Sequence, residues 1–224
     1  MAKVFNVGLI GCGHIAETYF RAHKYFNNFR ITKCADINQN AANKCAKINK
    51  IKAVTIKELL SDTDIKIILN LTIPAAHYKV AKQALLNGKH VYSEKPLAIN
   101  FQDGKKLIKL AKKKKLYVGN APDTFLGGGS QKSRDLLDKK VIGKVIFGNA
   151  IFAYPGIQSY HPNPESWFAK KGGGPVVDMG PYYLTALVNL LGPAKEVLSQ
   201  SEKGKETRVI GIGPKKGKKF KVMC

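Results

Sequence analysis

The feature that most constrains the fold is a short run near the N-terminus, in which a strand, a tight turn and a helix start follow one another: Val7-Gly8-Leu9-Ile10-Gly11-Cys12-Gly13-His14-Ile15-Ala16. The apolar residues 4–10 predict a buried parallel strand, and the small residues after them fit the turn that binds a dinucleotide pyrophosphate. Gly11 permits the sharp turn, Gly13 lets the phosphates approach the backbone, and Ala16 keeps the helix close to the sheet. The N–H groups at the helix start, from His14 and Ile15, then face the anion.

A glycine motif needs its structural context, and the next residues supply it. Residues 15–26 carry apolar and aromatic side chains at helical spacing, and residues 30–35 predict a second strand that ends at Asp36. Asp36 follows Ala16 by 20 residues, where a carboxylate accepts hydrogen bonds from the adenosine ribose hydroxyls. An aspartate here can instead cap the following helix. With all the other parts of the motif present, we interpret Asp36 as a cofactor ligand.

The pattern then alternates helices with strands as far as Asn120. Further helices are expected over residues 39–49, 56–60, 77–87 and 100–115, and further strands over residues 52–55, 65–71, 90–92 and 116–119. In the helix over residues 39–49 we expect Ile48 to face inward, together with Ala42, Cys45 and Ala46. Pro74 cannot continue a strand ladder, so the chain leaves the sheet at its carboxyl edge, where such folds bind ligands. Residues 1–120 therefore predict an α/β Rossmann domain with a doubly wound parallel sheet.

From Ala121 the pattern changes to that of an α+β second domain, over residues 121–224. Helices are expected over residues 127–139 and 174–191, and strands over residues 145–154, 197–201 and 207–212. Residues 155–173 are rich in proline and glycine and predict a loop. These elements leave an apolar sheet face and a long sheet edge without cover, so we expect an incomplete second domain.

Composition restricts the functional classes. No apolar run is long enough to span a membrane and the N-terminus shows no signal peptide, so we expect a cytoplasmic protein without a membrane partner. Four cysteines occur, at positions 12, 34, 45 and 224, and their spacing is not typical of a metal site. We therefore expect free thiols and no metal.

The chain is strongly basic, with 38 Lys and Arg against 15 Asp and Glu and a net charge of +23. The arginines are Arg21, Arg30, Arg134 and Arg208, and the other cations are lysines, which lack the planar fork that favours bidentate recognition of bases and phosphates. We interpret the charge as a solvated basic surface that binds polyanions non-specifically at low salt. No specific nucleic-acid partner is expected.

Several motifs match a known family. They are residues 11–16, Ala35-Asp36, Thr72-Ile73-Pro74 with His77, Gly88-Lys89-His90-Val91 leading to Glu94-Lys95-Pro96, and residues 172–180. With these motifs the chain resembles the family of glucose-fructose oxidoreductase and inositol dehydrogenase (Gfo/Idh/MocA). The resemblance implies an NAD- or NADP-dependent oxidoreductase whose nicotinamide lies between a Rossmann domain and a second α/β domain. It also places Thr72, Pro74, His77, Glu94 and Lys95 in the cofactor site.

The resemblance makes Lys95 the catalytic residue. Pro96 biases Lys95 toward an extended backbone, and its ammonium at a strand end can donate to a substrate oxygen while hydride leaves the adjacent carbon. The alternative is an exposed turn lysine. Many members of the family carry Asp-x-Gly-x-His, with the histidine as acid/base partner of the lysine. Here Asp178-Met179-Gly180-Pro181 is followed by Tyr182.

A tyrosine can fill the histidine's role, because its phenol donates a hydrogen bond or acts as a base when a nearby ammonium lowers its pKa. We favour Tyr182 as the partner of Lys95. The alternatives are that Tyr182 only packs in its helix, and that His161 in the preceding loop is the donor. Trp167 is a candidate wall of the substrate pocket.

The leading functional hypothesis is hydride transfer between the cofactor and a secondary alcohol of a sugar, cyclitol or related polyol. The competing hypothesis is a nucleotide-binding protein with little or no turnover. No arginine follows Asp36 to accept a 2′-phosphate, so we expect NAD rather than NADP, although Lys33 lies nearby. Family members are longer, and residues 221–224 resemble the middle of a strand. We therefore expect a C-terminally truncated chain with weak turnover alone, which forms homo-oligomers through the second-domain sheet.

Overall fold

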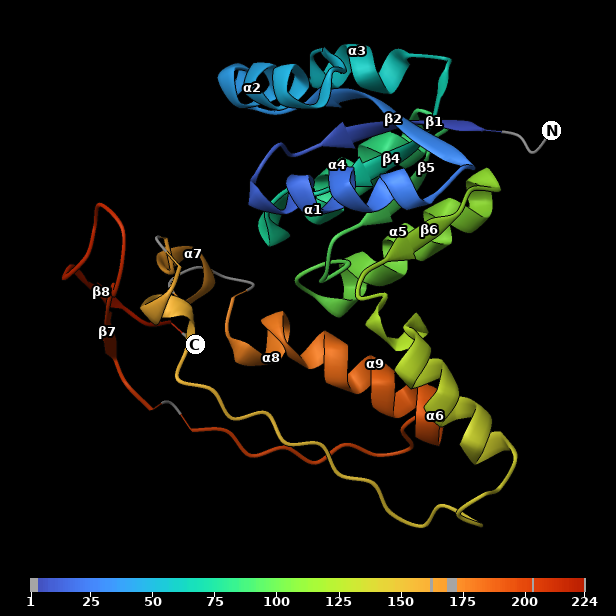
Figure 1. The fold of residues 1–224 in the computed structure, drawn as a ribbon, viewed down its shortest axis with the longest axis vertical. Coiled ribbons are helices and arrows are strands. Elements are labelled where there is room, and N and C mark those ends of the chain that lie inside the picture. Colours follow the sequence, from blue (N-terminus) through green and yellow to red (C-terminus); the bar gives the residue numbers. More distant parts are fainter. Residues whose placement is uncertain (1–3, 162, 169–172, 203, 224) are drawn as a thin grey trace. The chain divides into compact units, whose positions relative to one another are not determined.

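The computed structural model describes residues 4–161, 163–168, 173–202 and 204–223, and the chain forms two compact units, Met1–Ala121 and Pro122–Cys224 (Figure 1). The described strands of the first unit form one parallel sheet in the order β3-β2-β1-β4-β5-β6. They are β1 (Phe5–Ile10), β2 (Phe29–Ala35), β3 (Lys52–Ala53), β4 (Ile65–Asn70), β5 (His90–Ser93) and β6 (Val118–Asn120). This order confirms the predicted Rossmann sheet, with its topological switch point between β1 and β4.

Helices connect these strands in sequence. They are α1 (His14–Ala22), α2 (Gln39–Asn49), α3 (Ile56–Ser61), α4 (Pro74–Leu86) and α5 (Phe101–Lys114), with the 3-10 turn η1 (His23–Tyr25) after α1. Alternate strand residues face opposite sides of the sheet, so β1 directs Val7 and Leu9 into the core beneath α1 and α2. Ile10 joins the second core, which α3, α4 and α5 cover. Burial of each such side chain contributes roughly 1.5–3 kcal/mol.

Local sequence signals set the helix ends. The Asn38 side chain caps α2, Thr55 and Glu58 form a capping box on α3, and Asn100 caps α5. The fourth helix begins at Pro74 and not at residue 77 as predicted, because proline is well suited to the first helical turn.

The expected inward position of Ile48 is wrong, since this side chain is 67% exposed. The buried face of α2 consists of Ala42, Cys45 and Ala46, and Ile48 lies outside this stripe of i, i+3 and i+4 positions. The apolar character of Ile48 led to the prediction, but its position on the helix decides which way it faces.

The regular structure of the second unit is mostly helical within the described residues. Its helices are α6 (Gly128–Asp138), α7 (Glu165–Phe168), α8 (Pro175–Asp178) and α9 (Gly180–Leu191), with the 3-10 turns η2 (Thr124–Leu126) and η3 (Ile157–Ser159). Strands β7 (Thr207–Val209) and β8 (Lys219–Lys221) form an antiparallel pair. A small core unites residues far apart in sequence: Ile157, Phe168, Ile210, Phe220 and Val222. The predicted helix over residues 174–191 is divided at Met179, because Pro181 lacks the N–H that a continuous helix needs.

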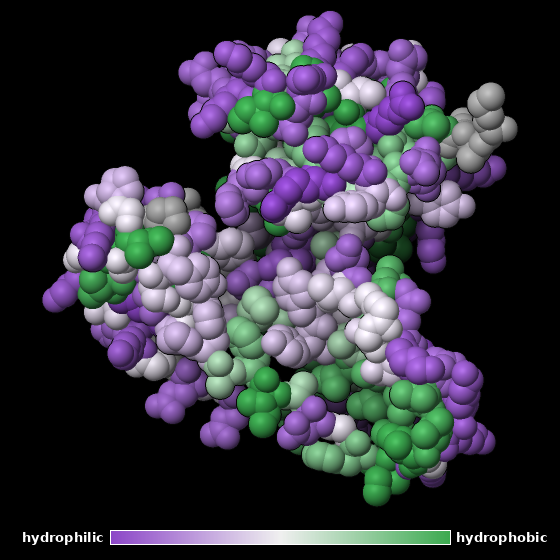
Figure 2. Space-filling model, in the orientation of Figure 1, coloured by the Kyte–Doolittle hydropathy of each residue, from purple (hydrophilic) through white to green (hydrophobic). Residues whose placement is uncertain are grey.

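Two predicted strands of the second unit are wrong. Residues 145–154 and 197–201 have no regular structure, and no described segment pairs with them. Their apolar side chains are exposed, as at Ile146 (91%) and Leu198 (100%). Figure 2 shows apolar side chains gathered beyond the end of α6, where Val141, Ile142 and Phe147 are exposed. Alternating apolar and polar residues form a strand only where a neighbouring strand supplies backbone hydrogen bonds.

Within the described part of the chain, no helix is long and apolar enough to cross a membrane.

Candidate active site

The turn after β1 has the geometry that its glycines predicted. Gly11 adopts φ +102°, and a Cβ at this position would lie 2.6 Å from the backbone carbonyl of Leu71. A Cβ on Gly13 would meet no described atom within 4 Å, so this residue opens onto free space. His14 and Ile15 form the exposed first turn of α1. The start of α1 is therefore open to solvent, and the N–H groups of a first helical turn are the groups that an anion would meet.

Asp36 is held over this turn. Its Oδ2 accepts a 2.7 Å hydrogen bond from the Cys12 N–H, and its Oδ1 accepts a 2.8 Å bond from the Asn38 N–H. The cap of α2 is Asn38, whose Oδ1 accepts from the Asn40 N–H at 3.0 Å. The capping role considered for Asp36 therefore belongs to Asn38, and the half-buried carboxylate of Asp36 faces the first turn instead.

A groove of about 920 Å³ begins at this turn. It is lined by Gly11, Gly13, Asp36 and Thr72 at the carboxyl ends of β1, β2 and β4, and by side chains of α3 and α4. The exposed Lys57 and Lys79 bring positive charge into the groove, which favours an anionic ligand. All of these residues belong to the first unit.

His77 is a buried side chain that contacts the two loops that follow β4 and β5. It is 1% exposed, and its Nδ1 and Nε2 lie 2.6 Å from the Pro96 carbonyl oxygen and 2.8 Å from the Thr72 carbonyl oxygen. The imidazole thus joins the loop after β4, where Pro74 begins α4, to the loop after β5. Its place in the structure is that of a positioning residue, because its side chain is closed off from the groove surface.

The Glu94-Lys95-Pro96 segment follows β5 directly. Tyr19 donates to Glu94 Oε1 at 2.8 Å, and the Lys95 N–H donates to Glu94 Oε2 at 3.1 Å. The Lys95–Pro96 peptide bond is cis. Lys95 is half-buried. Its backbone is therefore anchored at the carboxyl edge of the sheet, on the strand next to β4.

Two asparagines that sequence reasoning missed hold this edge together. Asn70 is fully buried, donates to the His77 carbonyl oxygen at 3.0 Å and accepts from the Thr72 hydroxyl at 2.7 Å. Asn120 donates at 3.0 Å to the carbonyl oxygens of both Ser93 and Glu94. The available signal was an asparagine in the last position of β4 and of β6.

The other predicted site residues belong to the second unit. Asp178 ends α8, and Tyr182 lies in the first turn of α9. His161 Nδ1 accepts from the Asn163 N–H at 3.1 Å, and its ring meets Trp167 edge-on with centroids 6.3 Å apart. Trp167 also packs against the small core of this unit.

A pair of tyrosines lies close to Asp178. The hydroxyls of Tyr154 and Tyr160 are 2.5 Å apart. Burial, this hydrogen bond and the charge of Asp178 raise the pKa of Tyr154. Sequence reasoning assigned no role to this pair.

Three cysteines meet beneath the turn. The Sγ atoms of Cys12, Cys34 and Cys45 lie within 4.8 Å of one another, and all three are free. A hydrogen bond with Cys34 raises the pKa of Cys12, whereas the same bond lowers the pKa of Cys34. Burial raises the pKa of Cys45 to about 11. Sequence spacing missed the cluster because its members come from a turn, a strand and a helix.

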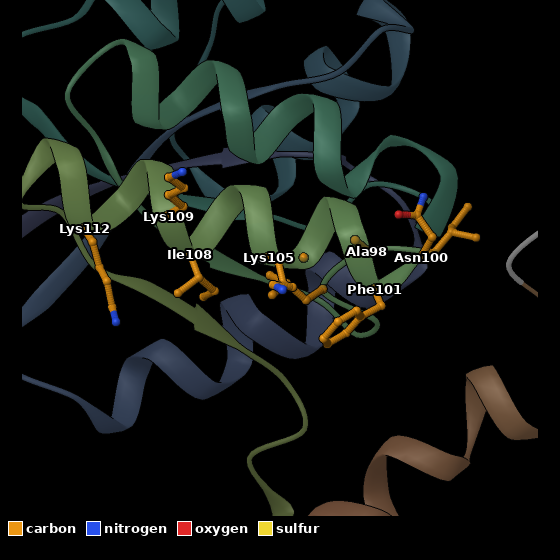
Figure 3. Close-up of a pocket in the computed structure, with 10 residues that line it drawn as sticks. Ala98, Asn100, Phe101, Lys105, Ile108, Lys109 and Lys112 are labelled. Carbon is orange, nitrogen blue, oxygen red and sulfur yellow. The ribbon is translucent and has the colours of Figure 1, made fainter.

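A second groove of the first unit, of about 680 Å³, follows α5. Figure 3 shows Phe101 and Ile108 projecting from this helix, with Lys105 and Lys112 among them. Its lining residues, from Leu97 to Lys112, are apolar, amide or lysine side chains. They include none of the residues assigned to the chemistry, so the groove that begins at Gly11 remains the candidate cofactor site.

Comparison with known families matches both units. The description "Oxidoreductase family, NAD-binding Rossmann fold" (GFO_IDH_MocA) fits residues 5–121, and the description "GFO/IDH/MocA C-terminal domain" fits residues 130–212. The 3-ketoreductase KijD10 from Actinomadura kijaniata, solved with NADP and TDP-benzene, has a TM-score of 0.71 and 25% identity. The match covers 85% of this chain and 58% of that one.

Curated relatives of this chain are named as dehydrogenases and reductases. Trans-1,2-dihydrobenzene-1,2-diol dehydrogenase of Xenopus laevis is 34% identical over 56% of this chain and 37% of the relative. The dTDP-3,4-didehydro-2,6-dideoxy-alpha-D-glucose 3-reductase of Saccharopolyspora spinosa is 27% identical over 93% of this chain and 63% of the relative. The chain spans about half the length of the curated relatives it matches.

Proposed function

Since this chain belongs to the Gfo/Idh/MocA oxidoreductase family, with an NAD-binding Rossmann domain over residues 5–121, we propose that it transfers hydride between a nicotinamide cofactor and a secondary alcohol of a sugar, cyclitol or related polyol. The observation that carries this proposal is the position of Lys95, anchored directly after β5 at the edge of the sheet that also holds Gly11, Asp36 and Thr72. The dehydrogenase and sugar-reductase names of the relatives support this substrate class.

The residues present fit the cofactor. Gly13 opens onto free space beside the start of α1, where the pyrophosphate would meet backbone N–H groups. Asp36 is oriented to accept the ribose hydroxyls, and the groove lining carries two lysines for the phosphates. When bound, the nicotinamide supplies the hydride donor or acceptor.

In this proposal Lys95 is the acid/base group that interacts with the substrate oxygen. Its ammonium donates to the substrate oxygen, which stabilises negative charge on that oxygen when the neighbouring carbon gains or loses hydride. The Glu94 carboxylate accepts the Lys95 N–H and the Asn70 carbonyl oxygen accepts the Glu94 N–H, so the ammonium starts from a defined strand end. We assign the second proton-transfer role to Tyr182, four residues after Asp178, and keep His161 as the competing candidate.

The test begins with Lys95→Met. We expect turnover to fall by about 10²-fold or more, with the Kd for NAD nearly unchanged, since the change removes an acid/base group and leaves the turn intact. The assay follows nicotinamide absorbance against sugars, cyclitols and polyols. Lys105→Met, on the exposed face of α5, is the matched control and should retain full turnover. NAD binding without turnover on any of these substrates in the unaltered chain would favour the competing hypothesis of a nucleotide-binding protein.

A second comparison identifies the partner of Lys95. Tyr182→Phe removes one hydroxyl and should lower turnover by about 10²-fold, whereas His161→Ala should leave it within a few-fold. Melting curves of both variants control for folding. Normal turnover in Tyr182→Phe combined with a loss in His161→Ala would transfer the role to the histidine.

A further inference from the structure

The three-cysteine cluster of the first unit has no role in the proposed hydride transfer. Cys12 lies in the turn between the two glycines, Cys34 in β2 and Cys45 in α2. Cys34 is 0% exposed and Cys45 is 9% exposed, whereas Cys12 is half-buried and connects the cluster to the surface. Two shielded thiols and one accessible thiol thus face a common centre.

The spacing of the sulfurs suits a single metal ion. Thiolate sulfurs bind Zn²⁺ at about 2.3 Å in tetrahedral geometry, which places the sulfurs about 3.8 Å apart. The three Sγ atoms already lie within 4.8 Å of one another. Each pair therefore needs to approach by about 1 Å at most, a shift that small side-chain rotations supply.

The contacts that now hold the thiols are weak enough to be replaced. Cys12 Sγ donates to the Ala35 carbonyl oxygen at 3.6 Å, and Cys34 Sγ donates to the Ala42 carbonyl oxygen at 3.5 Å. Thiols are weak donors, so little stabilisation is lost when they ionise onto a metal. The Asn49 amide lies 3.8 Å from Cys45 Sγ and can donate to the thiolate, as outer-shell partners of metal ligands do.

From this arrangement we propose that Cys12, Cys34 and Cys45 form a binding site for one thiophilic d¹⁰ cation, Zn²⁺ or its analogue Cd²⁺. The cation replaces three thiol protons, which pass to solvent, and no electron is transferred. A water molecule on the Cys12 side completes the tetrahedron, since this is the half-exposed side. The ligand set is three sulfurs, since the ligand atoms that lie within 4.8 Å of one another among the described residues are those of Cys12, Cys34 and Cys45. Soft thiolate ligands favour such ions over Mg²⁺ or Ca²⁺.

Titration of the full chain with Cd²⁺ tests the site directly, in a phosphine reductant that keeps thiols reduced. We expect one equivalent to bind and to produce an ultraviolet thiolate-to-cadmium band, and an excess of Zn²⁺ to compete with Cd²⁺ for the site. Each of Cys12→Ser, Cys34→Ser and Cys45→Ser should weaken binding by more than about 100-fold, beyond the usual loss from an outer-shell change. Cys224→Ser, outside the described residues, is the matched control and should bind Cd²⁺ normally.

A second measurement covers the case in which a serine variant fails to fold. In the unaltered chain, Cd²⁺ should slow alkylation of Cys12 by iodoacetamide, followed by peptide mass spectrometry, while Mg²⁺ should have no effect. Absence of the charge-transfer band, a band that disappears in Cys224→Ser, or alkylation of Cys12 at an unchanged rate would each overturn the proposal.

Discussion

At the scale of single residues, cofactor choice depends on one carboxylate that is fixed in place. Both oxygens of Asp36 accept backbone N–H groups, from Cys12 and Asn38, so the group cannot turn away from the groove. A 2′-phosphate next to it would meet a like charge. Lys33, the nearby cation, forms an ion pair with Asp62 and holds the pKa of that carboxyl below its usual range. Lys33 is therefore already engaged by Asp62.

These contacts predict that the chain binds NAD more tightly than NADP and that Asp36→Asn narrows the difference by about 10-fold or more, equivalent to about 1.4 kcal/mol. The amide keeps one acceptor oxygen and removes the charge that repels the phosphate. Fluorescence titration of both nucleotides measures the ratio. Lys33→Met is the control and should leave it unchanged. Equal affinity for the two nucleotides in the unaltered chain would contradict the prediction.

Gly11, Gly13 and Asp36 could be identified from the sequence, because each lies at a fixed number of residues from the end of a strand. The sequence did not identify Asn70, whose amide donates to the Ser93 hydroxyl, or Asn120, whose amide donates to the Glu94 carbonyl oxygen. These partners lie 23 and 26 residues away in sequence and meet the asparagines only in the folded sheet. A polar residue at a strand end is visible in the sequence, but its partner is not.

At the scale of elements, the turn between β1 and α1 requires its two glycines for different reasons. Gly11 has φ +102°, and a Cβ there would lie 2.6 Å from the Leu71 backbone. Gly13 has φ −78°, and the position that a Cβ would occupy is surrounded by free space, so the fold itself tolerates alanine there. Gly11 is therefore required by the backbone conformation of the turn, whereas Gly13 keeps space free for a ligand.

The pair Gly11→Ala and Gly13→Ala separates these effects. Gly11→Ala should lower the free energy of unfolding by about 1–3 kcal/mol or more, from strained φ and the clash with the next loop. Gly13→Ala should change it by less than about 0.5 kcal/mol. The same Gly13 variant should weaken NAD binding by about 10-fold or more, because its Cβ occupies the space for the phosphates. Denaturant unfolding and NAD titration give the two quantities, and equal destabilisation by both changes would contradict this division.

The elements differ in how well the sequence predicts them. Strands such as β1 and β4 are largely buried on both faces, and their apolar stretches can be recognised without knowing their neighbours. Residues 145–154 alternate as a strand would, yet within the described residues nothing pairs with them. Alternation of apolar and polar residues indicates a preference for extended structure, whereas a strand also needs a neighbouring strand for its backbone hydrogen bonds. The same limit applies to Ile48, whose apolar character does not reveal which side of α2 it occupies.

At the scale of the whole molecule, each unit has its own core. The two large clusters of buried side chains lie within residues 1–121, and the small cluster around Phe220 lies in the second unit. The described lining of the candidate cofactor groove, from Ile10 to Asn87, belongs to the first unit as well. The contacts expected to bind NAD therefore depend on one of the two units.

We accordingly predict that a fragment of residues 1–121 folds cooperatively and binds NAD with a Kd within about threefold of that of the full chain, a difference of less than about 1 kcal/mol. It should show no turnover, because Asp178 and Tyr182 are absent from it. Thermal melting and NAD titration test both statements, and Asp36→Asn in the fragment should raise the NADP affinity as it does in the full chain. A fragment that melts cooperatively but binds NAD more than about 10-fold less tightly would show that the second unit contributes directly to cofactor affinity. The first unit would then be only part of the nucleotide site.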